Sequence, residues 1–138
     1  MSQDWTTAEI SDLRRTKEIS LAVRGQDGRL GQALPVWVIT TDTPDIETVA
    51  IRSANGPTGS WYRRALTSRQ GRITVGRQQF DVNFIPVTDD RLSDLVDRAW
   101  LGKYGRWEKT WSRPIITPEI REATLCLVPE RRTTNPGE

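Results

Sequence analysis

A short loop with two glycines leads into a predicted helix start, and this segment, residues 53–64, contains the residue types that bind phosphate. The first backbone N–H groups of a helix lack partners within it, and the helix dipole places partial positive charge there. Glycines let the backbone approach a bound group, and arginines donate paired hydrogen bonds to phosphate or carboxylate. The segment therefore predicts an anion site. An ordinary capped turn on a basic surface explains the same residues, and the sequence leaves both interpretations open.

The candidate cofactor-binding residues lie on the preceding strand end, in the loop and in the first turn of the helix. They are Arg52, Ser53, Asn55, Gly56, Gly59, Ser60, Trp61 and Arg63. Ser60 is the expected N-cap of the helix. Arg63 and Arg64 project about 100° apart on a helix, so we expect at most one of them to face a site. Arg52 or Arg63 is the expected charged partner of the anion.

Four other side chains could do chemistry, and each has a structural alternative. Tyr62, the candidate catalytic residue, could donate a hydrogen bond or a proton to a ligand, or pack with its hydroxyl satisfied. Lys103 and Tyr104 come at the end of an amphipathic pattern, where a cation caps the helix dipole; the sequence leaves any further role open. Cys126 lies in an apolar strand pattern, which predicts an unreactive core thiol.

Several function classes are excluded by what the chain lacks. It has no histidine and one cysteine, so a Cys/His zinc site, a Ser-His-Asp triad and a Cys-His dyad are all missing their parts, and we expect no metal. No segment resembles a signal peptide or a membrane span, which predicts a cytoplasmic protein without a membrane partner. Twenty basic and 18 acidic residues are too balanced to favour nucleic-acid binding.

The pattern of apolar residues and turns predicts one domain over residues 1–129 and a loose tail over 130–138. A capping box at Thr6 and Glu9 precedes a helix over 7–15. The apolar alternation and turn residues predict strands over 18–24, 34–41, 47–54, 72–75, 79–87 and 123–128. A short helix is expected over 60–68 and another from about Asp90 to Gly105, followed by an irregular stretch over 107–118.

In this order the elements resemble the split β-barrel of flavin- and deazaflavin-binding oxidoreductases. The pieces that match the deazaflavin-dependent nitroreductase branch are Arg52-Ser53, Gly56, Trp61-Tyr62, Leu66 and Val75-Gly76. From about Trp5 to Pro129 the chain is similar, more specifically, to the bacterial family called domain of unknown function 2255. The pieces that carry this likeness are Asp27-Gly28, Pro35-Val36-Trp37-Val38, Ile51-Arg52-Ser53, Gly59-Ser60-Trp61-Tyr62-Arg63, Asp81-Val82, Ala99-Trp100, Lys103-Tyr104-Gly105, Ala123-Thr124-Leu125 and Val128-Pro129.

The resemblance implies a mainly β fold with flanking helices, a split barrel of about six strands, and a homodimer. It implies that the loop binds the phosphate of FMN or a deazaflavin, with Arg63 favoured as the cation, for hydride transfer on a small molecule. The alternative is a cofactor-free pocket protein that binds or isomerises a small anionic metabolite. Whether the chain is an enzyme stays open at this point. Single-strand nucleic-acid binding is a third reading, which the near-neutral charge disfavours.

Overall fold

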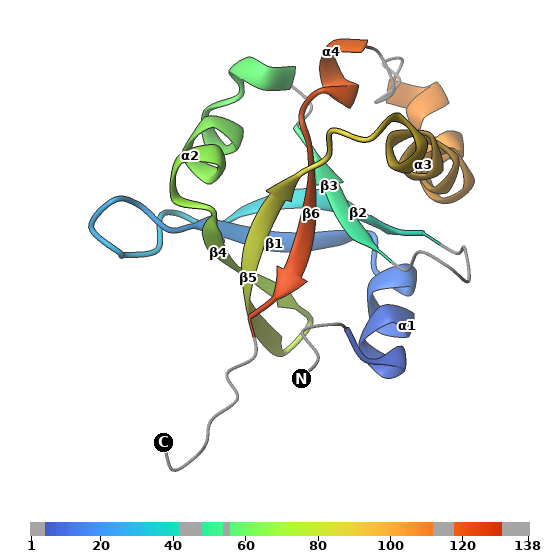
Figure 1. Cartoon of the computed structure of the whole chain (residues 1–138). Helices are drawn as coiled ribbons and strands as arrows, with labels where there is room; N and C mark the ends of the chain where they lie inside the picture. Colours follow the sequence, from blue (N-terminus) through green and yellow to red (C-terminus); the bar gives the residue numbers. More distant parts are fainter. Residues whose placement is uncertain (1–4, 42–47, 54–55, 112–117, 131–138) are drawn as a thin grey trace.

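Six antiparallel strands close into a barrel in this computed structural model, which describes residues 5–41, 48–53, 56–111 and 118–130. The strands are β1 (Glu18–Val23), β2 (Leu34–Thr40), β3 (Val49–Arg52), β4 (Gln70–Val75), β5 (Gln78–Pro86) and β6 (Thr124–Pro129). Around the barrel their order is β1, β2, β3, β6, β5, β4, and β4 pairs again with β1 (Figure 1). The predicted six-stranded barrel is confirmed.

Alternating apolar residues build the interior of the barrel. In β5, Val82 and Phe84 point into the core, while Ile85 lies on the outside with 48% of its surface exposed. Strand β3 is buried on both faces because Ile51 packs inside the barrel and Ala50 packs against a long helix. Gly71 on β4 leaves room for the ring of Phe84, since a Cβ there would lie 2.6 Å from a ring carbon.

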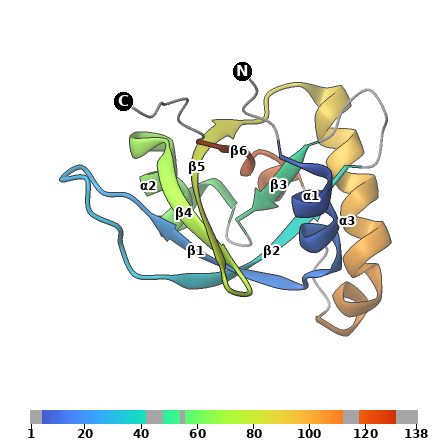
Figure 2. The ribbon, with the colours of Figure 1, turned by 90° about the horizontal axis from the view of Figure 1, so that it is seen from below.

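Helices cover the outside of the barrel on two sides. Helix α1 (Thr7–Arg15) and the long α3 (Asp90–Trp111) both pack on β2 (Figure 2). On the other side, the short 3-10 helix η1 (Gly56–Thr58) leads into α2 (Ser60–Ser68), which contacts β1, β4 and β5. Helix α4 (Pro118–Arg121) precedes β6. The capping box at Thr6 and Glu9 and the bounds of α1 and α2 agree with the sequence analysis.

Three sequence-based expectations are wrong. Helix α3 continues past Gly105 to Trp111, because a helix interior tolerates a glycine at a modest cost. The N-cap of α2 is Gly59, so Ser60 already belongs to the first turn. Cys126 lies on the outer, half-buried face of β6, since its neighbours Leu125 and Leu127 fill the inner face. Asn55 and the tail over 131–138 lie outside the described residues.

Lys103 and Tyr104 join α3 to the start of the barrel. The Tyr104 hydroxyl accepts a hydrogen bond from the backbone N–H of Val38 at 3.0 Å and also contacts the carbonyl oxygen of Lys17. The Lys103 ammonium donates to the carbonyl oxygens of Leu13 and Val38 at 2.9 and 2.8 Å. These bonds connect the end of α1, the start of β1 and the middle of β2. The structure therefore gives both residues a role in positioning backbone.

Two tryptophans that could have stacked on a ligand pack within the fold instead. Trp37 stacks on Tyr104 with ring centroids 4.2 Å apart and planes 13° apart. Trp100 on α3 is fully buried beside Tyr104 and the guanidinium of Arg52. Both rings therefore belong to the contact between α3 and the barrel.

Candidate functional site

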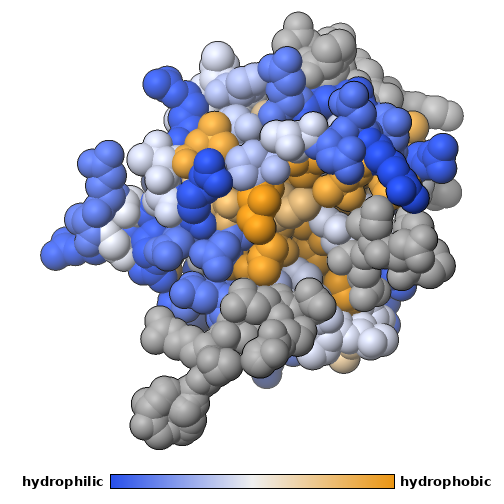
Figure 3. Space-filling model, viewed as in Figure 1, coloured by the Kyte–Doolittle hydropathy of each residue, from blue (hydrophilic) through white to orange (hydrophobic). Residues whose placement is uncertain are grey.

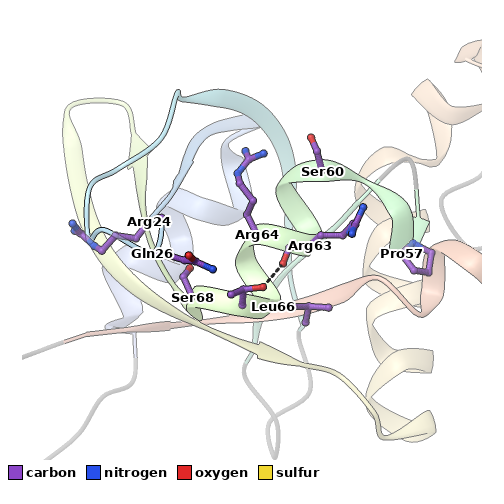
Figure 4. A pocket seen from close by; sticks show the side chains of 10 residues that line it. Arg24, Gln26, Pro57, Ser60, Arg63, Arg64, Leu66 and Ser68 are labelled. Carbon is purple, nitrogen blue, oxygen red and sulfur yellow. Dashed lines mark hydrogen bonds between the residues drawn. The ribbon is translucent and has the colours of Figure 1, made fainter.

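A broad open groove runs along α2, between this helix and the connection from β1 to β2 (Figure 4). Its volume is about 760 Å³. Its lining residues are Arg24, Gly25, Gln26, Pro57, Ser60, Arg63, Arg64, Leu66, Thr67 and Ser68. We call it the arginine groove. From α2 it takes Ser60, Arg63, Arg64 and Thr67, which share one helix face because they are spaced three and four residues apart.

Positive charge dominates the arginine groove. Arg63 and Arg64 are exposed side chains of α2, a helix without an acidic residue. Arg24 follows β1 and is half-buried; its Nη1 donates to the carbonyl oxygen of Gly28 at 2.6 Å. No carboxylate is among the described residues that line the groove. The side chains of Pro57 and Leu66 add apolar surface, so the groove suits a ligand with an anionic group and an apolar part.

Two of the sequence-predicted binding residues line this groove, namely Ser60 and Arg63. Both Arg63 and Arg64 line the groove, although Figure 4 shows them projecting in different directions, so the expectation that at most one of them faces a site stays a prediction. Neither Trp61 nor Gly59 lines it. The N–H groups of Gly56 and Gly59 bond within the loop, to the carbonyl oxygens of Ser53 and Gly56. The lining of this groove therefore comes more from the face of α2 than from the glycine loop.

Arg52 lies outside the groove, in a buried ion cluster under α3. Its Nη2 lies 2.7 Å from Oδ1 of Asp97, and its Nε donates to the Thr124 hydroxyl at 2.7 Å. The other carboxylate oxygen of Asp97 lies 2.9 Å from Nε of Arg121. The Arg52 side chain is 0% exposed, and the two ion pairs of Asp97 connect β3, α3 and α4. The Oδ1 of Asp94 lies 2.6 Å from Nη2 of Arg121.

Tyr62 is buried on the inner side of α2. Its hydroxyl donates to the carbonyl oxygen of Glu122 at 3.0 Å, and Trp61 meets its ring edge-on at 6.2 Å. Burial, with the nearby Glu122 carboxylate, raises the pKa of the Tyr62 hydroxyl above its ordinary value. A high pKa and an internal acceptor both suit a packing role. The catalytic role of Tyr62 stays a prediction that this geometry does not favour.

Sequence reasoning missed Arg24 and Gln26 as candidate site residues. They precede a tight turn in which Gly28 has a positive φ of 84° and Asp27 accepts the N–H of Arg29. The Asp27-Gly28 pair in the sequence predicts that turn. The pairing of β1 with β4 brings Arg24 and Gln26 beside α2. This proximity depends on strands far apart in the sequence, so a local sequence pattern does not predict it.

Other classes of site find little support in the described part of the chain. No three His, Cys, Asp or Glu side chains among the described residues gather as metal ligands. In the same ranges, no helix is both long and apolar enough to cross a membrane.

Residues 9–127 match a family of uncharacterised proteins conserved in bacteria, DUF2255. The chain belongs to this family. A search of curated protein sequences finds no match. Among solved structures, the chain is similar to HutZ, the heme storage protein from Vibrio cholerae, with a TM-score of 0.60, 16% identity and 91% of each chain covered.

Two further structures share the fold of this DUF2255 chain. A FAD-binding protein from Mesorhizobium loti has a TM-score of 0.58 and 15% identity, over 92% of this chain and 91% of that one. A putative 5-nitroimidazole antibiotic resistance protein from Bacteroides thetaiotaomicron has a TM-score of 0.55 and 13% identity, over 91% and 81%. At such low identities the likeness establishes the barrel fold alone.

Proposed function

We propose that this DUF2255 protein binds a phosphate-bearing flavin or deazaflavin in the arginine groove and positions it for hydride transfer with a small molecule. The observation that carries the proposal is the groove itself, where Arg24, Arg63 and Arg64 surround about 760 Å³ of accessible space. Small-molecule and cofactor sites usually measure about 300–1,000 Å³. Relatives of the same fold are described as binding FAD and storing heme, which supports cofactor binding.

The residues of the groove fit the phosphate end of such a cofactor. Arg63 and Arg64 present planar guanidinium groups that match a phosphate, and the Ser60 hydroxyl lies on the same helix face. Leu66 and Pro57 can bury part of an apolar ring. When bound, a flavin or deazaflavin would supply the hydride chemistry. The chain's own part is to hold the phosphate, orient the ring and exclude water from one side of it.

A cofactor-free binding protein is the second candidate, and the same arginines favour it. Any small anionic metabolite would meet the same guanidinium groups. Isomerisation is harder to place, because the described groove lining has no carboxylate, thiol or phenol to serve as a general base. The alternative therefore reduces to anion binding, unless a group from outside this lining enters.

The visible absorption spectrum of the purified protein separates these functions. We expect FMN or a deazaflavin to shift its absorption band on mixing and to remain with the protein through gel filtration. Riboflavin, which lacks the phosphate, is the matched ligand control and should bind more weakly. If no flavin or deazaflavin binds while a simple phosphorylated metabolite does, the cofactor-free alternative is the function.

A further inference from the structure

We infer that the arginine groove recognises a ligand with two anionic groups that stand apart, one held by Arg63 and Arg64 and the second by Arg24. This inference rests on the proposed site but makes no use of redox chemistry. It names the ligand class more narrowly as a bis-anion. A mononucleotide such as FMN has one phosphate and would occupy only one of the two anion sites.

The first anion site lies on the α2 wall. Arg63 and Arg64 are neighbours on a helix without acidic residues, and no described carboxylate pairs with either guanidinium. Figure 4 shows the Arg63 side chain extending toward Pro57, at one end of the groove, and Arg64 projecting in another direction from the same helix. Arg63 and the Ser60 hydroxyl, which share a helix face, offer one end of a ligand charge-assisted donors, and Arg64 adds positive charge to the same wall.

The second anion site lies on the opposite wall, at the end of β1. Figure 4 places Arg24 and Gln26 at the other end of the groove from Arg63 and Pro57, with the Gln26 amide pointing toward α2 and the Arg24 guanidinium pointing away from it along the β1–β2 connection. The Arg24 side chain is 26% exposed, and its bond to the Gly28 carbonyl oxygen anchors it beside the loop. A guanidinium has five N–H donors, so Arg24 keeps donors for a ligand, and the amide of Gln26 adds more.

Asp81 moderates this second site. Its Oδ1 lies 2.8 Å from Nε of Arg72 and only 3.8 Å from Nη2 of Arg24. Arg72 is therefore the main partner of this carboxylate, and the contact with Arg24 is the weaker of the two. A carboxylate this near to Arg24 competes with a ligand anion for the same guanidinium. Removing its charge should strengthen binding of the second anion.

Isothermal titration calorimetry with two sugar phosphates, at low and at physiological salt, tests the inference. The probes are fructose 6-phosphate, with one phosphate, and fructose 1,6-bisphosphate, with two. We expect the bisphosphate to bind about tenfold more tightly, the scale of one extra charge-assisted contact. Arg24→Gln should remove this preference and leave the affinity for fructose 6-phosphate within about twofold. Arg63→Gln should weaken both, and Asp81→Asn should increase the preference for the bisphosphate.

The matched control is Arg29→Gln, which removes an arginine from the same loop that does not line the groove. We expect it to change neither affinity. A preference for the bisphosphate that survives Arg24→Gln reflects net charge alone and overturns the inference, as does equal affinity for the two probes or binding of neither. If Arg24→Gln does not fold, the inference is tested by comparing the affinities for the two probes in the unmutated protein and in Arg24→Lys.

Failure of this inference and failure of the proposed function give different results. A bisphosphate preference that depends on Arg24, without any binding of FMN or deazaflavin, supports the two-anion groove and removes the flavin. Binding of FMN with no preference between the sugar phosphates supports the flavin and removes the second anion site.

Discussion

The guanidinium of Arg52 is fully buried between β3 and α3, whereas the guanidinium of Arg63 is exposed to solvent on α2. Both were candidate partners for a bound anion. Burying a charge is costly unless it is paired, and Arg52 is paired with Asp97 and hydrogen-bonded to Thr124. An exposed arginine beside a groove needs no such compensation and can meet a ligand. Burial therefore gives Arg52 a structural role and leaves Arg63 available for the proposed binding role.

Single substitutions should show this separation. Arg52→Leu should lower the free energy of unfolding by about 1–3 kcal/mol, because Asp97 loses one of its two arginine partners and the Thr124 hydroxyl loses a donor. Arg63→Ala should instead weaken FMN binding by about 1.5–3 kcal/mol with little change in stability. Arg63→Lys should recover part of the affinity, since the charge remains without the planar fork. Urea unfolding and flavin titration of the three variants measure these effects. A normal affinity in Arg63→Ala would move the site away from α2.

Lys103 makes a second prediction at the scale of single residues, for the pH dependence of stability. Burial, and then the nearby Arg14, lower the pKa of the Lys103 ammonium to about 8 from its ordinary 10.5. The folded state therefore binds this proton less tightly than the unfolded state does. Between pH 8 and 10.5 the unfolded chain keeps the proton while the folded protein loses it, so this group's contribution to stability rises with pH.

Comparison with Lys103→Met isolates that contribution. The stability of the unmutated protein relative to this variant should increase from pH 8 to 10.5, as measured by urea unfolding at several pH values. Since the aliphatic part of the side chain is retained in Met, packing is held nearly constant. A difference that stays flat over this range would show that the ammonium titrates normally in the fold.

At the scale of secondary structure, the sequence predicts helix α2 in full but only part of the arginine groove beside it. The pattern of residues 60–68 predicts the helix, and Ser60 and Arg63 on it do line the groove. Gly105 suggested the end of α3, yet the helix continues to Trp111, because one glycine costs a helix interior only about 1 kcal/mol. Arg24 could not be placed, because its distance from α2 depends on β1 pairing with β4. Local sequence patterns predict the individual helices and strands. Which of these elements lie next to one another depends on how the strands pair to close the barrel.

Helix α3 also contains an exposed glycine, Gly102, which allows the cost of a glycine in this helix to be measured. A Cβ on Gly102 would meet nothing within 4 Å, and its backbone is helical. Gly102→Ala should therefore raise the free energy of unfolding by about 0.5–1 kcal/mol, because alanine loses less backbone entropy on folding. Thermal or urea unfolding measures it. Gly71→Ala is the opposite case: its Cβ would lie 2.6 Å from the carbonyl oxygen of Ala22, so that variant should be less stable. A destabilised Gly102→Ala would indicate that another surface covers this helix face.

At the scale of the whole molecule, the barrel shows an apolar outer surface on β5 and β6. Ile85 is 48% exposed there, paired across the strands with Cys126, and Val128 is half-buried beside them. Figure 3 shows apolar surface at the centre of this face. Burial raises the pKa of the Cys126 thiol to about 11, which keeps it protonated and slow to react.

We expect this face to lie at the interface of a homodimer, as the resemblance to split barrels implies. Sedimentation equilibrium at micromolar concentration should give twice the chain mass. Ile85→Glu should shift the protein toward monomer, because burying a carboxylate in the interface is unfavourable. Leu101→Glu is the matched control, since Leu101 is also 48% exposed but belongs to α3 and not to β5 or β6. A monomer in the unmutated protein, or an equal effect of both substitutions, would rule out this interface.

The position of β6 between β3 and β5 has a consequence for synthesis of the protein. The ribosome makes β6 after the five other strands, so until it emerges the nascent chain holds two unpaired strand edges, on β3 and β5. Open edges of this kind invite pairing with other chains. Release of β6 from the ribosome is therefore the step that ends this exposure, and a translational stall just before Thr124 should leave a nascent chain that depends on chaperones.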